Sequence, residues 1–176
     1  MYPVKTYINQ GILKMALTQS QSAAETLAPN EIKITVKSDL FSHQAQATSP
    51  VDLFTFIAEK KISNLVAQIN ISNFTTGNRV DLSQASKAGF NTEVLGLTQP
   101  TDISITNGNL QVTLIDAPSL EDINTWIITF ESVNQQIINA VESAANPQAA
   151  FTSIADIWGE GWITLVSDKK ENSDKK

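Results

Sequence analysis

Several short segments alternate apolar with polar residues, which is the pattern of β-strands that bury one face. In the first of them Ile32, Ile34 and Val36 are separated by lysine or threonine. The pattern predicts strands at residues 31–38, 65–72 and 162–166.

A β-hairpin is predicted around Asn107-Gly108, because Asn-Gly supplies the two positive φ angles of a type I′ turn. Both flanking segments, 102–106 and 109–114, alternate polar with apolar residues. The turn sets a register in which Ile105 pairs with Leu110 and Ile103 with Val112.

A longer period, with apolar residues three, four or seven positions apart, runs through residues 120–145 and predicts a long helix. Ser119 is placed as its N-cap. The segment Thr125–Phe130 is β-branched and aromatic, so a strand there is the alternative. The apolar stripe comprises Ile123, Ile127, Phe130, Ile137, Val141 and Ala144.

Two further helix starts are predicted where an N-cap residue precedes proline. Asn146-Pro147 opens a short helix that Gly159 ends, and Ser49-Pro50 opens one that reaches about Lys61.

These elements predict an α+β fold: a mainly antiparallel sheet of four to six strands, packed against the long helix and the shorter helix that follows. Residues 31–167 are expected to form a single domain. Residues 1–30 are interpreted as an N-terminal arm or weak helix, and residues 168–176 as a disordered charged tail.

Composition narrows the classes of function. Of the 176 residues 17% are charged, the net charge is −6, and Arg79 is the single arginine. No basic stripe can therefore follow a nucleic-acid backbone. No apolar run approaches about 18 residues, so we expect no membrane span. The chain has no cysteine, which fits a reducing compartment, and we expect a cytoplasmic location.

Catalytic chemistry has few candidates in this sequence. One histidine, His43, and no cysteine leave no convincing nucleophile–base pair, so the sequence favours a non-enzyme and we predict no cofactor. Asp116, Glu121 and Asp122 concentrate carboxylates beside a turn, where they could bind a hard cation. Acidic residues are also typical of an ordinary helix start.

Four aromatic residues of the second half are candidates for ligand binding: Trp126, Phe130, Trp158 and Trp162. Large aromatic side chains line many pockets and interfaces. Their helical spacing favours the alternative, core packing of helices on the sheet.

The sequence therefore favours a non-catalytic protein-interaction or structural assembly subunit. The alternative is a small-ligand-binding domain or carboxylate-dependent enzyme, with a pocket between the sheet and the long helix. We expect self-association, with a dimer favoured over a monomer, through the long helix or edge strands between residues 79 and 97. A further protein partner is expected but not identified.

Overall fold

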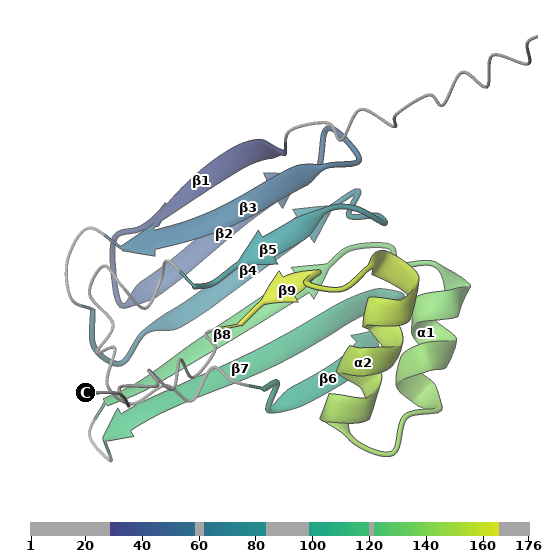
Figure 1. Cartoon of the computed structure of the whole chain (residues 1–176). Helices are drawn as coiled ribbons and strands as arrows, with labels where there is room; N and C mark the ends of the chain where they lie inside the picture. Colours follow the sequence, from purple (N-terminus) through teal and green to yellow (C-terminus); the bar gives the residue numbers. More distant parts are fainter. Residues whose placement is uncertain (1–28, 59–61, 84–98, 120–121, 166–176) are drawn as a thin grey trace, which may run out of the picture.

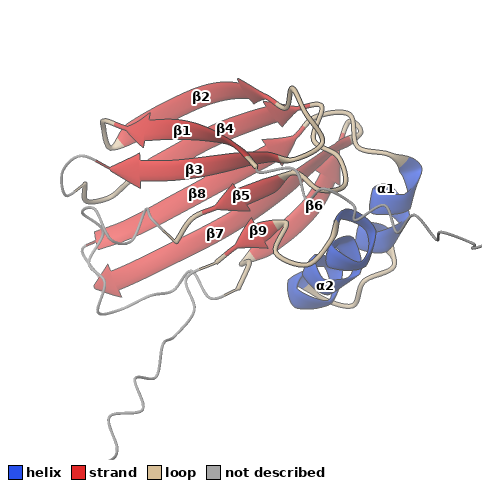
Figure 2. Cartoon of the chain, turned by 45° about the horizontal axis from the view of Figure 1, so that its top comes forward, coloured by secondary structure: helices blue, strands red, loops and turns tan. Residues whose placement is uncertain are grey.

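The chain passes repeatedly between two stacked β-sheets, which two short helices accompany in an α+β fold (Figure 1; Figure 2). The computed structural model describes residues 29–58, 62–83, 99–119 and 122–165. The elements are β1 (Asn30–Val36), β2 (Leu40–Gln46), β3 (Asp52–Ala58), β4 (Val66–Ser72), β5 (Arg79–Asp81), β6 (Asp102–Thr106), β7 (Asn109–Ser119), β8 (Asp122–Phe130), α1 (Gln135–Glu142), α2 (Pro147–Trp158) and β9 (Ile163–Thr164).

Sheet A has the order β1-β3-β5-β9, and all of its strands are parallel. Sheet B has the order β2-β4-β8-β7-β6. In sheet B, β2, β4 and β8 are parallel, and β7 and β6 add an antiparallel hairpin. Each parallel pair needs a crossover connection, and for three pairs a single strand of the opposite sheet provides it: β2 connects β1 to β3, β3 connects β2 to β4, and β4 connects β3 to β5.

The core lies between the two sheets, where buried side chains of neighbouring strands form rows in register. One row of sheet B runs from β2 to β6 through His43, Ile69, Ile128, Val112 and Ile103. Apart from His43, which is half-buried, these residues are buried apolar side chains. Burial of such rows stabilises the stack of strands.

The helices lie beside β6, at the opposite end of the stack from β1 and β2 (Figure 1). The Asn134 side chain caps α1 by accepting a hydrogen bond from the Ile137 N–H at 3.1 Å. Asn146 caps α2 in the same way through the Ala149 N–H at 2.8 Å. Ile137 and Ile154 enter the core, so the helices cover this end of the stack.

The predicted helix over residues 120–145 is wrong in its first half. Residues 122–130 form β8, and the helix that follows, α1, has eight residues. β8 hydrogen-bonds to β4 on one side and β7 on the other, and this pairing overrides the helical period. The strand alternative for Thr125–Phe130 is confirmed.

The prediction of a mainly antiparallel sheet is also wrong, because the strands from β1 to β5 alternate between the two sheets instead of pairing with their neighbours in sequence. Only β6, β7 and β8 pair in antiparallel order within the described residues. The helix predicted from Ser49 to Lys61 is strand β3 in its described part. The hairpin register at Asn107-Gly108 and the helix after Asn146-Pro147 are confirmed. The predicted tail, residues 1–28 of the predicted arm, and residues 84–97 of the predicted edge-strand region lie outside the described residues, whereas Asn30 begins β1.

Candidate functional site

The candidate interface is the end of the stack formed by β1 and β2 (Figure 1). β1 is the edge strand of sheet A and β2 is the edge strand of sheet B. Within the described ranges, no strand pairs with the outer side of either one. Two seven-residue edges therefore lie side by side at the end that the helices do not cover.

The backbone of β1 presents unpaired groups on alternate residues. The Asn30 N–H donates to the Val51 carbonyl at 3.2 Å, so the even-numbered residues of β1 direct their backbone groups toward β3. Glu31, Lys33 and Thr35 consequently direct their N–H and C=O groups away from sheet A. These groups can accept a further strand.

The backbone of β2 behaves in the same way, with the opposite parity. The Ala47 N–H donates to the Ser72 carbonyl at 2.9 Å, and the Asp39 carbonyl accepts from Val66. The odd-numbered residues of β2 therefore point toward β4. Ser42 and Gln44 direct their backbone groups to the free edge.

The side chains of β2 offer no electrostatic barrier to another strand. Its sequence, LFSHQAQ, contains no acid, lysine or arginine. Natural edge strands usually carry charge, proline or a bulge to prevent strand addition. Leu40 is 75% exposed, and His43 stacks on Phe41 with ring centroids 6.0 Å apart.

The inward face is incompletely covered at this end. Ile32, Phe41 and Ala45 face the core but are partly buried, whereas Phe56, Ile69 and Ile71 of the next two strands are 0% exposed. Stacked repeats normally carry a polar cap on their last repeat, because an uncapped end leaves apolar core side chains accessible to water.

The loop before β3 is held by a buried carboxylate, Asp52, which is 0% exposed. One oxygen accepts from Asn30 Nδ2 at 2.9 Å and from Ser49 Oγ at 2.8 Å. The other accepts from the Thr48 and Ser49 N–H groups and from the Thr48 hydroxyl. Burial alone raises the pKa of Asp52, but these hydrogen bonds outweigh it, and the pKa lies well below its usual range. The bond from Asn30 ties the start of edge strand β1 to β3.

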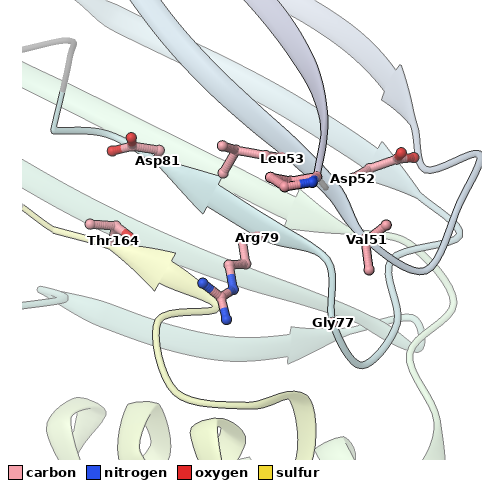
Figure 3. A pocket seen from close by; sticks show the side chains of 8 residues that line it. Val51, Asp52, Leu53, Gly77, Arg79, Asp81 and Thr164 are labelled. Atoms are coloured by element: carbon pink, nitrogen blue, oxygen red, sulfur yellow. The ribbon is translucent and has the colours of Figure 1, made fainter. Parts of the chain in front are cut away.

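A second candidate site is a hollow of about 410 Å³ on the outer side of sheet A (Figure 3). It is lined by Pro29, Val51, Asp52, Leu53, Gly77, Arg79, Asp81 and Thr164. The carboxylates of Asp52 and Asp81 point away from the Arg79 guanidinium in Figure 3. Arg79 is exposed, and among the described residues no carboxylate forms an ion pair with it.

The four aromatic residues predicted to bind a ligand are buried, with at most 4% exposure. Phe130, Trp158 and Trp162 contact one another with ring centroids 5.3 to 5.6 Å apart, and Trp126 contacts Phe56 at 5.8 Å. Trp158 alone of the four also lines a small hollow, of about 150 Å³, between the turn before β5 and the start of α1. A ligand role for these residues stays a prediction.

The predicted cation ligands lie where β7 and β8 meet. Asp116 is opposite Asn124 in the strand register, and Asp122 is opposite Ser119. The side chains of these two acids, and Glu121 as a whole, lie outside the described residues. The cation hypothesis therefore stays a prediction; elsewhere in the described ranges, no cluster of three acidic or histidine side chains could hold a metal.

The fold changes parts of the two predicted dimer surfaces. The first half of the predicted long helix does not form, because residues 122–130 are strand β8, and α1 is the helical part of that segment. β5 is an interior strand between β3 and β9, so it is not a free edge. The edge at β2 was missed because no strand was predicted between residues 38 and 49, although Phe41, His43 and Ala45 alternate with polar residues.

Comparison of the chain with known protein families, with curated proteins and with solved structures finds no match. Within the described residues, no helix is both long and apolar enough to span a membrane.

Proposed function

We propose that this protein is a non-catalytic assembly subunit that binds another polypeptide by strand addition at the β1 and β2 edges. The observation that carries the proposal is the uncharged, unpaired edge of β2 beside the unpaired edge of β1. Strand addition satisfies exposed backbone groups with main-chain hydrogen bonds.

The partly buried side chains at the same end support this function. A strand added beside β2 would extend the rows that end at Phe41, His43 and Ala45, and would remove their apolar surface from water. Both contributions, hydrogen bonds and apolar burial, then come from one docking event.

The test places lysine at the edge and, as a control, one strand further in. Gln44 of β2 and Gln68 of β4 are both exposed and lie on the outer side of sheet B. Lysine on an edge strand disfavours strand addition. Static light scattering should show that Gln44→Lys raises the protein concentration at which the isolated chain begins to associate, whereas Gln68→Lys leaves it unchanged. Equal onsets for both variants would contradict the proposal.

The hollow at Arg79 supports a second candidate function, binding of a small organic anion. A guanidinium pairs with carboxylates through a two-pronged fork, and Val51 and Leu53 provide apolar contact beside it. This hollow lies on the outer side of sheet A, not between a sheet and a long helix.

Thermal shift measurements with hexanoate and with inorganic phosphate would test this second candidate. We expect hexanoate to raise the melting temperature of the wild type and of Lys33→Gln, but not of Arg79→Gln, because a ligand of the folded state stabilises it. Lys33 is the control because it is another exposed cation on the outer side of sheet A. The same rise in melting temperature in all three proteins would show that Arg79 does not bind the anion.

A further inference from the structure

We infer that the polypeptide that docks on this end is a second copy of the chain, related by a two-fold axis that runs perpendicular to the sheets. β1 then pairs antiparallel with the partner's β1, and β2 pairs antiparallel with the partner's β2. This inference rests on the proposed function and names its partner.

The charges of β1 favour a second copy over an unrelated strand. Glu31 and Lys33 are the acid and the base of β1, and their side chains lie together on its outer face, with Nζ and Oε2 3.5 Å apart. In an antiparallel pair centred on Ile32, Glu31 lies opposite the partner's Lys33. The two-fold axis repeats this pairing, so two oppositely charged pairs form across one interface.

The backbone geometry agrees with the same register. Antiparallel strands alternate residue pairs that exchange two hydrogen bonds with pairs that exchange none. Glu31 and Lys33 direct their backbone groups to the free edge, so each can exchange both bonds with its opposite residue in the partner. Ile32 directs its groups toward β3, and it falls at the position where no bonds are exchanged.

Neighbouring registers are less favourable because they bring like charges together. A pair centred on Lys33 places the two lysines opposite each other, and a pair centred on Glu31 does the same for the two acids. Parallel addition in register also sets Glu31 beside the partner's Glu31. β2 carries no formal charge, so it tolerates the register that β1 selects.

The other end of the stack argues for a closed dimer instead of a filament. A head-to-tail filament would join the β1 and β2 edges to β9 and β6 of the next copy. α1 and α2 pack against β6, and β9 has two residues. The end that carries the two seven-residue edges is complementary to itself, which is the condition for a two-fold interface.

Charge exchange between positions 31 and 33 tests the register. Glu31→Lys gives a chain with two lysines on β1, and Lys33→Glu gives one with two acids. Each variant alone should dimerise about tenfold more weakly than the wild type, because both cross-strand pairs become repulsive. An equimolar mixture, with one variant labelled with ¹⁵N so that the two chains differ in mass, should form a heterodimer that native mass spectrometry resolves. The double variant should dimerise as the wild type does.

Glu142→Lys is the matched control for Glu31→Lys, since it makes the same change in net charge at an exposed residue of α1, at the far end. It should leave dimerisation unchanged. If Gln44→Lys blocks association but the mixture forms no heterodimer, the register is wrong while edge docking stands. If the wild type associates and Gln44→Lys and Gln68→Lys change its association alike, both proposals fail. A wild type of 19.1 kDa at every concentration up to millimolar would overturn the second copy as partner.

Discussion

Asn78 donates a hydrogen bond from its side-chain amide to the backbone carbonyl of Ser49, 2.6 Å away. Its amide oxygen accepts from the Thr75 N–H at 2.9 Å. The side chain is 0% exposed. One buried amide therefore holds together the turn before β3 and the turn before β5, which are adjacent strands of sheet A.

We expect Asn78→Ala to lower the free energy of unfolding by about 2 to 3 kcal/mol, because the Ser49 carbonyl and the Thr75 N–H lose their buried partner. Denaturant titration measures the change. Asn139→Ala is the control, since the amide of Asn139 accepts from Gln135 on the exposed surface of α1. A loss as large in the control would show that burial of Asn78 is not the cause.

Gly77 lies in the same turn and should not tolerate a side chain. Its φ is +96°, and a Cβ there would clash with the Pro50 carbonyl oxygen. Gly108, in the hairpin turn, has φ +76° but no atom within 4 Å of a Cβ. Gly108→Ala should lower the free energy of unfolding by about 1 kcal/mol because of its backbone conformation. Gly77→Ala should lower it by clearly more in the same denaturant titration. Equal costs would argue against a close approach at Pro50.

The sequence predicted the strands and turns better than their arrangement. Alternation at 31–38 and 65–72 located β1 and β4, and Asn107-Gly108 set the correct hairpin register. Local patterns of this kind depend on neighbouring residues. Which strands pair depends on long-range contacts, and the three residues between β1 and β2 connect two different sheets here.

The wrong helix at Ser49 has a specific physical reason. Ser49 Oγ does accept from the Val51 N–H at 3.2 Å, as a helix cap would. The Asp52 carboxylate, however, accepts from the backbone N–H groups before it, and the chain continues as β3. The residue types that are typical of a helix start therefore form a capped turn before a strand here. The candidate site was missed for a related reason. A strand is an edge strand only when no other strand pairs with its outer side, and this depends on long-range contacts.

Acid should destabilise the protein through Asp52. Its pKa is lower in the folded chain than the value of about 4 typical of an unfolded chain. The unfolded chain therefore takes up a proton first as the pH falls. The contribution of Asp52 to the free energy of unfolding is complete at neutral pH and is lost progressively below about pH 4.

Asp52→Asn tests this contribution, since its amide nitrogen would face the N–H donors of Thr48 and Ser49. We expect a loss of about 3 kcal/mol near neutral pH and a smaller difference from the wild type as the pH falls below 4. Asp39→Asn changes an exposed carboxylate and should have little effect at either pH. A difference that does not change with pH would contradict the assignment to the ionised carboxylate.

Removal of the Thr55 hydroxyl should stabilise the protein. Its side chain is 3% exposed, and its Oγ1 has no hydrogen-bond partner in the described part of the chain. A buried hydroxyl without a partner loses its hydration and gains nothing in return. Thr55→Val keeps the β-branched shape and should raise the free energy of unfolding by about 1 kcal/mol. The control is Thr48→Val, which removes a hydroxyl that donates to Asp52 at 3.2 Å and should destabilise the protein in the same denaturant titration. A loss of stability in Thr55→Val would mean that the hydroxyl has a partner in the folded protein.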